Sequence, residues 1–88
     1  IAARRQDYRA ASAETTRALR LAQAAGDRMS QAQIFFNLGN YLQQLGKRDE
    51  AEESYRAAQA LAEALGWAAG VATAEQALAA IGIVPARG

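Results

Sequence analysis

Apolar residues recur along most of the chain at steps of three and four, which is the spacing of one face of an α-helix. The clearest stripes are Ile34, Phe35, Leu38, Leu42 and Leu45 in one segment and Ala51, Tyr55, Ala58, Leu61, Ala62 and Leu65 in the next. A thinner, Ala-rich stripe precedes them (Ala11, Ala18, Leu21, Ala22, Ala25), and a short one follows (Val71, Ala74, Leu78, Ile81). The pattern predicts helices over residues 7–25, 28–45, 48–65 and 68–81.

Glycines separate these four segments. Gly26, Gly46 and Gly66 are equally spaced, and each follows an amphipathic stretch. Glycine is common just after a helix because it adopts positive φ without steric cost. Asp27 follows Gly26 directly and Asp49 follows Gly46 closely, and Asp is favoured at the N-cap or in the first turn of a helix. Links this short make consecutive helices pack antiparallel, so we predict an all-α fold of antiparallel helical hairpins.

The sequence also matches itself after a shift of forty positions. The matched pairs are Ala11/Ala51, Ala18/Ala58, Leu21/Leu61, Ala22/Ala62, Ala24/Ala64, Gly26/Gly66, Ala32/Ala72 and Leu38/Leu78. Chance matches of Ala are expected in an Ala-rich chain, so the Leu and Gly pairs carry most of the weight. A fixed period of this length is typical of stacked helical repeats.

One stretch of the chain resembles a tetratricopeptide repeat. It comprises the segment Phe35-Phe36-Asn37-Leu38-Gly39-Asn40 followed by Gly46, Ala51, Tyr55 and Ala58. The family has small residues where paired helices cross closely, as at Gly39 and Ala51, and aromatic residues between hairpins, as at Phe35 and Tyr55. The forty-residue spacing is similar to the long form of the repeat, found in kinesin light chains, Pins-type adaptors and bacterial regulators. The usual repeat has about 34 residues and ends in Pro, which is missing here.

The resemblance implies a single domain over residues 1–88, out of phase with the repeat. Residues 7–25 would be the second helix of a preceding repeat, 28–65 a complete repeat, 68–81 a first or capping helix, and 82–88 a tail. The outer helices depart from the family pattern. Thr15 occupies the position of Tyr55, Glu75 that of Phe35, and Ala79 that of Gly39.

In this family the first helix of each repeat lines a concave surface that binds a peptide or a partner helix. The side chains that the resemblance places there are Gln33, Phe36, Asn37, Asn40, Gln43 and Gln44. An Asn offers both a donor and an acceptor, so Asn37 and Asn40 would hold a peptide backbone. Equally, polar residues suit any exposed helix face. Phe36 is either an exposed contact residue or packs on a neighbouring helix, and Trp67 either anchors an interface or covers Leu65 and Val71.

Composition narrows the possible chemistry. The 88 residues contain no Cys and no His, which removes thiol nucleophiles, His-based acid–base catalysis and zinc sites with nitrogen or sulfur ligands. Net charge is +1, too low for a dedicated nucleic-acid binder, and no apolar run approaches bilayer length. The many acidic residues near Asp49 suit the start of a helix. We therefore expect a non-enzyme without cofactors or metals, which binds neither nucleic acid nor membrane.

Two functions fit this pattern. The first is a protein–protein interaction module, an adaptor or scaffold that binds a peptide or partner helix on its concave face. The second is a structural element that completes its solenoid by homo-oligomerisation, because a repeat cannot bury its own apolar faces. The single Lys and the abundance of Arg and Ala favour a bacterial, GC-rich genome, and the cytoplasm is the default location.

Overall fold

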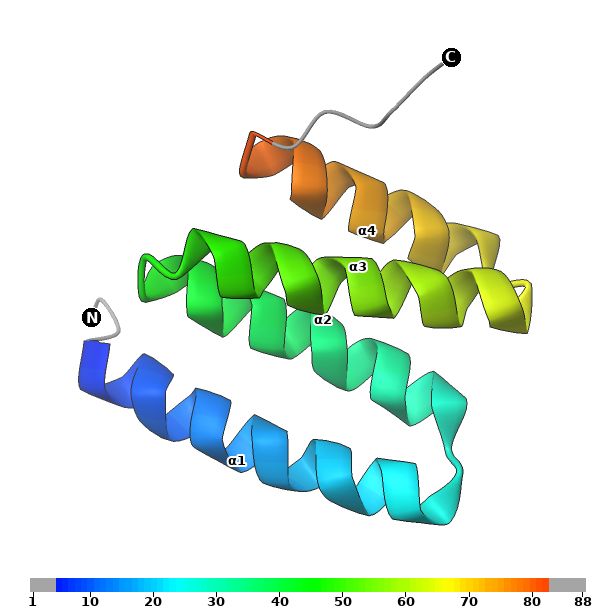
Figure 1. Cartoon of the computed structure of the whole chain (residues 1–88), viewed down its shortest axis with the longest axis horizontal. Helices are drawn as coiled ribbons and strands as arrows, with labels where there is room; N and C mark the ends of the chain where they lie inside the picture. Colours follow the sequence, from blue (N-terminus) through cyan, green and yellow to red (C-terminus); the bar gives the residue numbers. More distant parts are fainter. Residues whose placement is uncertain (1–4, 83–88) are drawn as a thin grey trace.

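The computed structural model describes residues 5–82, and this part of the chain is all-helical. The helices are α1 (Arg5–Ala25), α2 (Arg28–Gln44), α3 (Arg48–Leu65) and α4 (Ala68–Ala80). Each runs antiparallel to the one before it, and they follow one another in sequence order across the molecule (Figure 1). The four predicted helices are confirmed, with ends within two residues of the prediction. Nothing described here is long and apolar enough to cross a membrane as a helix.

The same turn joins each helix to the next. Gly26, Gly46 and Gly66 have φ of 69°, 77° and 68°. This left-handed conformation would be strained in a residue with a side chain. At Gly46 the turn is closed by two backbone hydrogen bonds, from Lys47 N–H to Leu42 C=O at 2.9 Å and from Gly46 N–H to Gln43 C=O at 3.0 Å. This is the Schellman motif, which satisfies carbonyls at the helix end. The turns at Gly26 and Gly66 repeat it.

The residue after each glycine is the N-cap of the next helix. Asp27, Lys47 and Trp67 share nearly one backbone conformation, with φ between −92° and −88° and ψ between 71° and 87°. Asp27 also caps α2 with its side chain, which accepts hydrogen bonds from the Ser30 hydroxyl at 2.6 Å and the Ser30 N–H at 3.1 Å. These two bonds lower the pKa of Asp27. Asp49 lies in the first turn of α3, where its charge complements the helix dipole.

The core lies mainly among α2, α3 and α4. Its fully packed centre consists of Leu42, Ala51, Tyr55 and Leu78, one or two from each of these helices. Small buried residues on α2 and α3, including Ala32, Ala58 and Ala62, let the helices approach closely. The molecule is consequently a slab of 39 × 33 × 21 Å, about two helix diameters thick.

The tightest contact in this core joins α2 to α3. A Cβ added to Gly39 would lie 2.6 Å from Cε1 and 2.8 Å from Cδ1 of Tyr55, closer than real atoms approach. The Tyr55 ring therefore occupies the space that any larger residue at position 39 would need. Tyr55 is only 1% exposed, so this contact also buries the largest side chain of the core.

The start of α4 is held by a second aromatic contact. Gly70 is buried under the Trp67 ring, which leaves no room for a Cβ there. Trp67 also meets Phe36 of α2 edge-to-face, with ring centroids 6.0 Å apart, a favoured aromatic geometry. At the other end of α4, the Arg48 side chain donates a hydrogen bond to the Ile81 carbonyl at 2.7 Å. Both ends of α4 are thus tied to helices that precede it.

Within the described part of the chain, helix α1 has fewer buried residues than α2, α3 or α4. Ala22 is its one buried residue among those whose side chains are described, and Tyr8 meets Tyr41 of α2 with centroids 6.3 Å apart. The assignment of Leu21 and Ala25 to a packed stripe is wrong, because Leu21 is 70% exposed and Ala25 is also exposed. Leu65, at the end of α3, is likewise 39% exposed. No described helix covers the side of α1 from which Leu21 projects.

We predict that Gly39→Ala destabilises the fold. Ala is the better helix former by about 1 kcal/mol, yet its Cβ would overlap the Tyr55 ring, and overpacking of this kind costs about 1–3 kcal/mol. Urea unfolding followed by circular dichroism should show a net loss of stability. In a Tyr55→Leu background the penalty should shrink, and a Gly39→Ala variant as stable as the parent would contradict the close approach.

Candidate functional site

The six predicted contact residues share one side of α2. Five of them, Gln33, Asn37, Asn40, Gln43 and Gln44, are exposed, and Phe36 is half-buried. Their spacing places them on one side of the helix, and one edge of that side, at Asn40 and Gln43, borders the face that packs on α3 through Gly39 and Leu42. The structure therefore brings them together as one polar surface. Their roles within that surface differ, because some of them are already engaged by the core.

Asn40 and Gln43 are bonded to the fold itself. The Tyr55 hydroxyl donates to the Asn40 Oδ1 atom at 2.5 Å, and the Gln43 Oε1 atom lies 3.2 Å from the same hydroxyl. A buried phenol needs such a partner, since an unsatisfied buried hydroxyl costs free energy. Both side chains therefore stabilise the α2–α3 pair. The interpretation of Asn40 as a residue devoted to a peptide leaves out this structural role.

Phe36 is engaged in the same way. Its ring packs edge-to-face on Trp67 and rests against the core cluster. Of the two interpretations of Phe36, packing on a neighbouring helix is the one seen, and Trp67 covers the start of α4 at Gly70. The polar surface of α2 thus offers Gln33, Asn37 and Gln44 as exposed side chains without a structural partner among the described residues.

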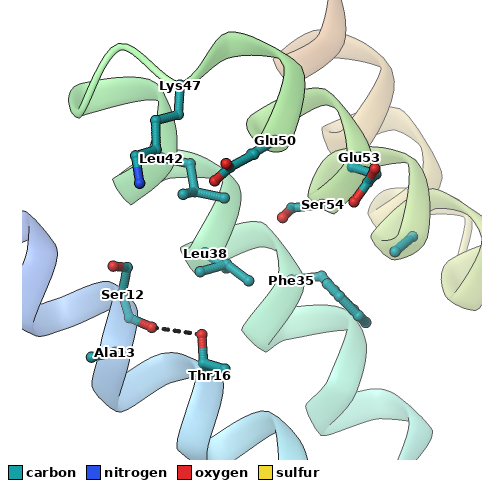
Figure 2. Close-up of a pocket in the computed structure, with 11 residues that line it drawn as sticks. Ser12, Ala13, Thr16, Phe35, Leu38, Leu42, Lys47, Glu50, Glu53 and Ser54 are labelled. Carbon is teal, nitrogen blue, oxygen red and sulfur yellow. Dashed lines mark hydrogen bonds between the residues drawn. The ribbon is translucent and has the colours of Figure 1, made fainter.

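A groove lies on another side of α2. It has a volume of about 620 Å³ and is bounded by α1, α2 and α3, which Figure 2 shows with their side chains. Phe35, Leu38 and Leu42 of α2 form an apolar floor. The other lining residues are Ser12, Ala13 and Thr16 on α1, Lys47 at the N-cap of α3, and Glu50, Glu53, Ser54 and Ala57 on α3. None of the six residues predicted from the resemblance lines it.

Short side chains on α1 explain why this space is open. Ser12 and Thr16 face the groove, but their hydroxyls bond back to their own helix, to the carbonyls of Arg9 at 3.0 Å and Ser12 at 2.9 Å. The second of these bonds is the dashed line in Figure 2. Hydroxyls bonded in this way are turned back to their own helix and do not fill the groove. Phe35 and Leu38 on the opposite side of the groove therefore remain half-buried.

Charge is distributed unevenly along the α3 wall of the groove. Lys47 lies at the start of this wall, and Glu50 and Glu53 follow it, all three of them exposed. Along the helix axis Glu50 lies about 4.5 Å and Glu53 about 9 Å beyond Lys47, so the positive charge is at one end of this wall and the negative charges follow it. A ligand with an apolar centre, an anionic group at one end and a cationic group at the other would match this arrangement.

The groove could not be recognised from one helix at a time. Within α2 alone, Phe35 and Leu38 belong to the apolar stripe, and within α3 alone, Glu50 and Glu53 suit the beginning of a helix. A signal is present at Thr16 of α1, whose equivalent forty residues later is the much larger Arg56 of α3, because a small residue on one helix leaves space beside the next. No group of three or more acidic side chains in residues 5–82 is arranged to hold a metal ion.

Comparisons of the chain with protein-family models, with curated proteins and with solved structures find no significant match.

We predict different effects for the two Asn residues. Asn40→Ala removes an acceptor of the buried Tyr55 hydroxyl, which should lower the free energy of unfolding by about 1 kcal/mol. Asn37→Ala makes the same change in helix propensity at an exposed position of the same helix. The free energy of unfolding of this variant should equal that of the parent or be slightly higher. Chemical denaturation of the two variants side by side measures the difference. Equal stabilities would mean that the Tyr55–Asn40 bond adds nothing.

Stability should also fall at high pH because of Tyr55. Burial raises the pKa of the Tyr55 phenol above its ordinary value of 10.0. The unfolded chain then loses this proton at lower pH than the folded chain, so stability is fully present below pH 10.0 and declines as pH rises through the folded-state pKa. Above pH 10.0 the free energy of unfolding should fall less steeply with pH in Tyr55→Phe than in the parent. Identical slopes of this free energy against pH would refute the effect.

Proposed function

We propose that this chain is a protein-interaction module of the helical-repeat class, similar to the tetratricopeptide repeat, that binds a peptide segment of a partner protein. The observation that carries the proposal is the groove between α1 and α3. Its volume, about 620 Å³, is within the range of about 300–1,000 Å³ typical of ligand sites. Its apolar floor and charged wall suit a short amphipathic segment more closely than a small uncharged molecule.

The groove also specifies the chemistry of that segment. Phe35, Leu38 and Leu42 would receive one or two apolar side chains, which is how apolar grooves bind amphipathic helices and extended peptides. Glu50 and Glu53 would pair with a Lys or Arg of the peptide, and Lys47 with a carboxylate at its other end. Because the charges are separated along α3, they would fix the direction in which the peptide lies.

The polar surface of α2 is the competing location for the same function. It corresponds to the concave surface of the family that the chain resembles, and Asn37 is exposed there. This surface lacks an apolar anchor, however, because Phe36 is packed on Trp67. Most of the binding energy at protein interfaces comes from a few buried apolar or aromatic contacts. The groove provides such a place and the polar surface does not.

A selected peptide would distinguish the two surfaces. Peptides bound by the chain can be enriched from a displayed random library and their affinities measured by titration calorimetry at low salt. We expect enriched sequences to combine apolar residues with a Lys or Arg. Glu53→Lys should weaken their binding about tenfold, since it replaces an attraction by a repulsion. Exchanging the basic residue of the peptide for Glu should restore affinity for this variant.

Asn37→Ala is the matched control, because it changes an exposed residue outside the groove. It should leave the affinity unchanged. If Asn37→Ala abolishes binding and Glu53→Lys does not, the partner lies on the polar surface of α2 and the groove proposal is wrong. If the library yields no peptide that binds the folded chain, the interaction function itself loses its support.

A further inference from the structure

Within residues 5–82, each of the two outer helices has one face that no other described helix covers, and these two faces differ. On α1 the face contains Glu14, Arg17 and Leu21, all exposed, with Leu21 at 70%. On α4 it contains Ala72, Glu75 and Ala79, also exposed. Residues in each set are three or four positions apart and so lie on one side of their helix. We call them the α1 face and the α4 face.

Each face has a counterpart forty residues away that is covered inside the molecule. Glu14 and Leu21 correspond to Ser54 and Leu61 of α3, where Ser54 is 6% exposed and Leu61 is half-buried. Ser54 lines the same groove as Phe35 of α2, so this side of α3 is turned towards α2. The α1 face is therefore the equivalent of a surface that receives a helix like α2.

The α4 face is equivalent to the other half of that contact. Ala72, Glu75 and Ala79 correspond to Ala32, Phe35 and Gly39 of α2. Ala32 is fully buried, and Gly39 lies against the Tyr55 ring of α3. Among the described helices the α2–α3 contact is thus made once, and α1 and α4 each carry one half of an equivalent contact that no described residue completes.

The residues that differ between these equivalent faces compensate for one another. Inside the molecule a glycine, Gly39, receives a large side chain, Tyr55. At the ends Ala79 replaces the glycine and could not accommodate a Tyr, but Thr15 replaces the Tyr. The two changes in size compensate each other where Ala79 and Thr15 meet. Within one chain these residues lie on α4 and α1, the last and the first helix, which are not packed on each other.

A second exchange follows the same rule for charge. Phe35 of α2 and Ala57 of α3 line one groove, and forty residues away their equivalents are Glu75 and Arg17. Two apolar residues that line one groove are thus replaced by two residues of opposite charge. In the free chain Arg17 is 4.0 Å from Glu14, and both side chains are about three-quarters exposed, at 76% and 77%. Arg17 therefore remains accessible to Glu75 of another molecule.

We infer that the α4 face of one copy of this chain packs on the α1 face of a second copy, with the geometry of the internal α2–α3 contact and a Glu75–Arg17 ion pair between the copies. This contact joins two unlike surfaces. Each added copy presents a fresh α4 or α1 face, so the assembly extends head to tail and does not stop at a symmetric dimer. The groove is bounded by other residues and remains available in each copy.

Charge reversal with exchange tests this assembly. Sedimentation velocity of the full chain at low salt, over a wide concentration range, should show a mass that grows with concentration. Glu75→Arg and Arg17→Glu should each weaken self-association about tenfold, because like charges then oppose each other. Mixing the two variants should restore association, since each α4 face then meets an α1 face of opposite charge.

One control variant, one further test of the α1 face and a check of folding accompany the charge reversals. Glu63→Arg, a reversal of an exposed charge outside both faces, should leave association unchanged, and Leu21→Gln should weaken it. All four substituted positions are exposed, so circular dichroism should show the helix content of the parent in every variant. A chain that stays monomeric at all concentrations overturns the inference. So does association that survives both charge reversals or that mixing the variants fails to restore.

Discussion

The close contact between Gly39 and Tyr55 determines the arrangement of the rest of the molecule. Without a Cβ at position 39 the ring lies directly on the α2 backbone, which draws α2 and α3 together and carries the phenol to the edge of the pair. There Asn40 and Gln43 accept its hydrogen bond. Leu42, Ala51 and Leu78 pack around the same ring. The core, the interface between α3 and α4, and two residues of the polar surface of α2 thus depend on one glycine–tyrosine contact.

Repetition of a single turn explains the architecture. Three Schellman motifs with left-handed glycines, each followed by a residue of nearly the same conformation, reverse the chain at regular intervals. Identical turns place successive helices in equivalent relations, so each inner helix is packed on both sides and each outer helix on one. Exposed Leu21 is a consequence of this geometry. A linear array leaves two unlike ends, whereas a closed bundle would have none.

The groove and the polar surface show how packing redistributes residues of similar sequence character. Phe35 and Phe36 are neighbours in the chain, yet one forms the floor of the groove and the other packs on Trp67. Asn37 and Asn40 look equivalent as exposed polar positions, but only Asn40 meets the Tyr55 hydroxyl. These differences arise from residues on α3 and α4, so inspection of α2 alone does not reveal them.

The sequence by itself determined the number of helices, their ends and their antiparallel order, because periodicity, positive-φ glycines and capping residues act within a few positions of one another. It also indicated the forty-residue equivalence and its departures at Thr15, Glu75 and Ala79. The tertiary structure decided which apolar residues are covered, where a groove opens and which polar side chains serve the fold. Those outcomes depend on side-chain volume and hydrogen bonding between helices that are distant in the chain, and local patterns do not encode these distances.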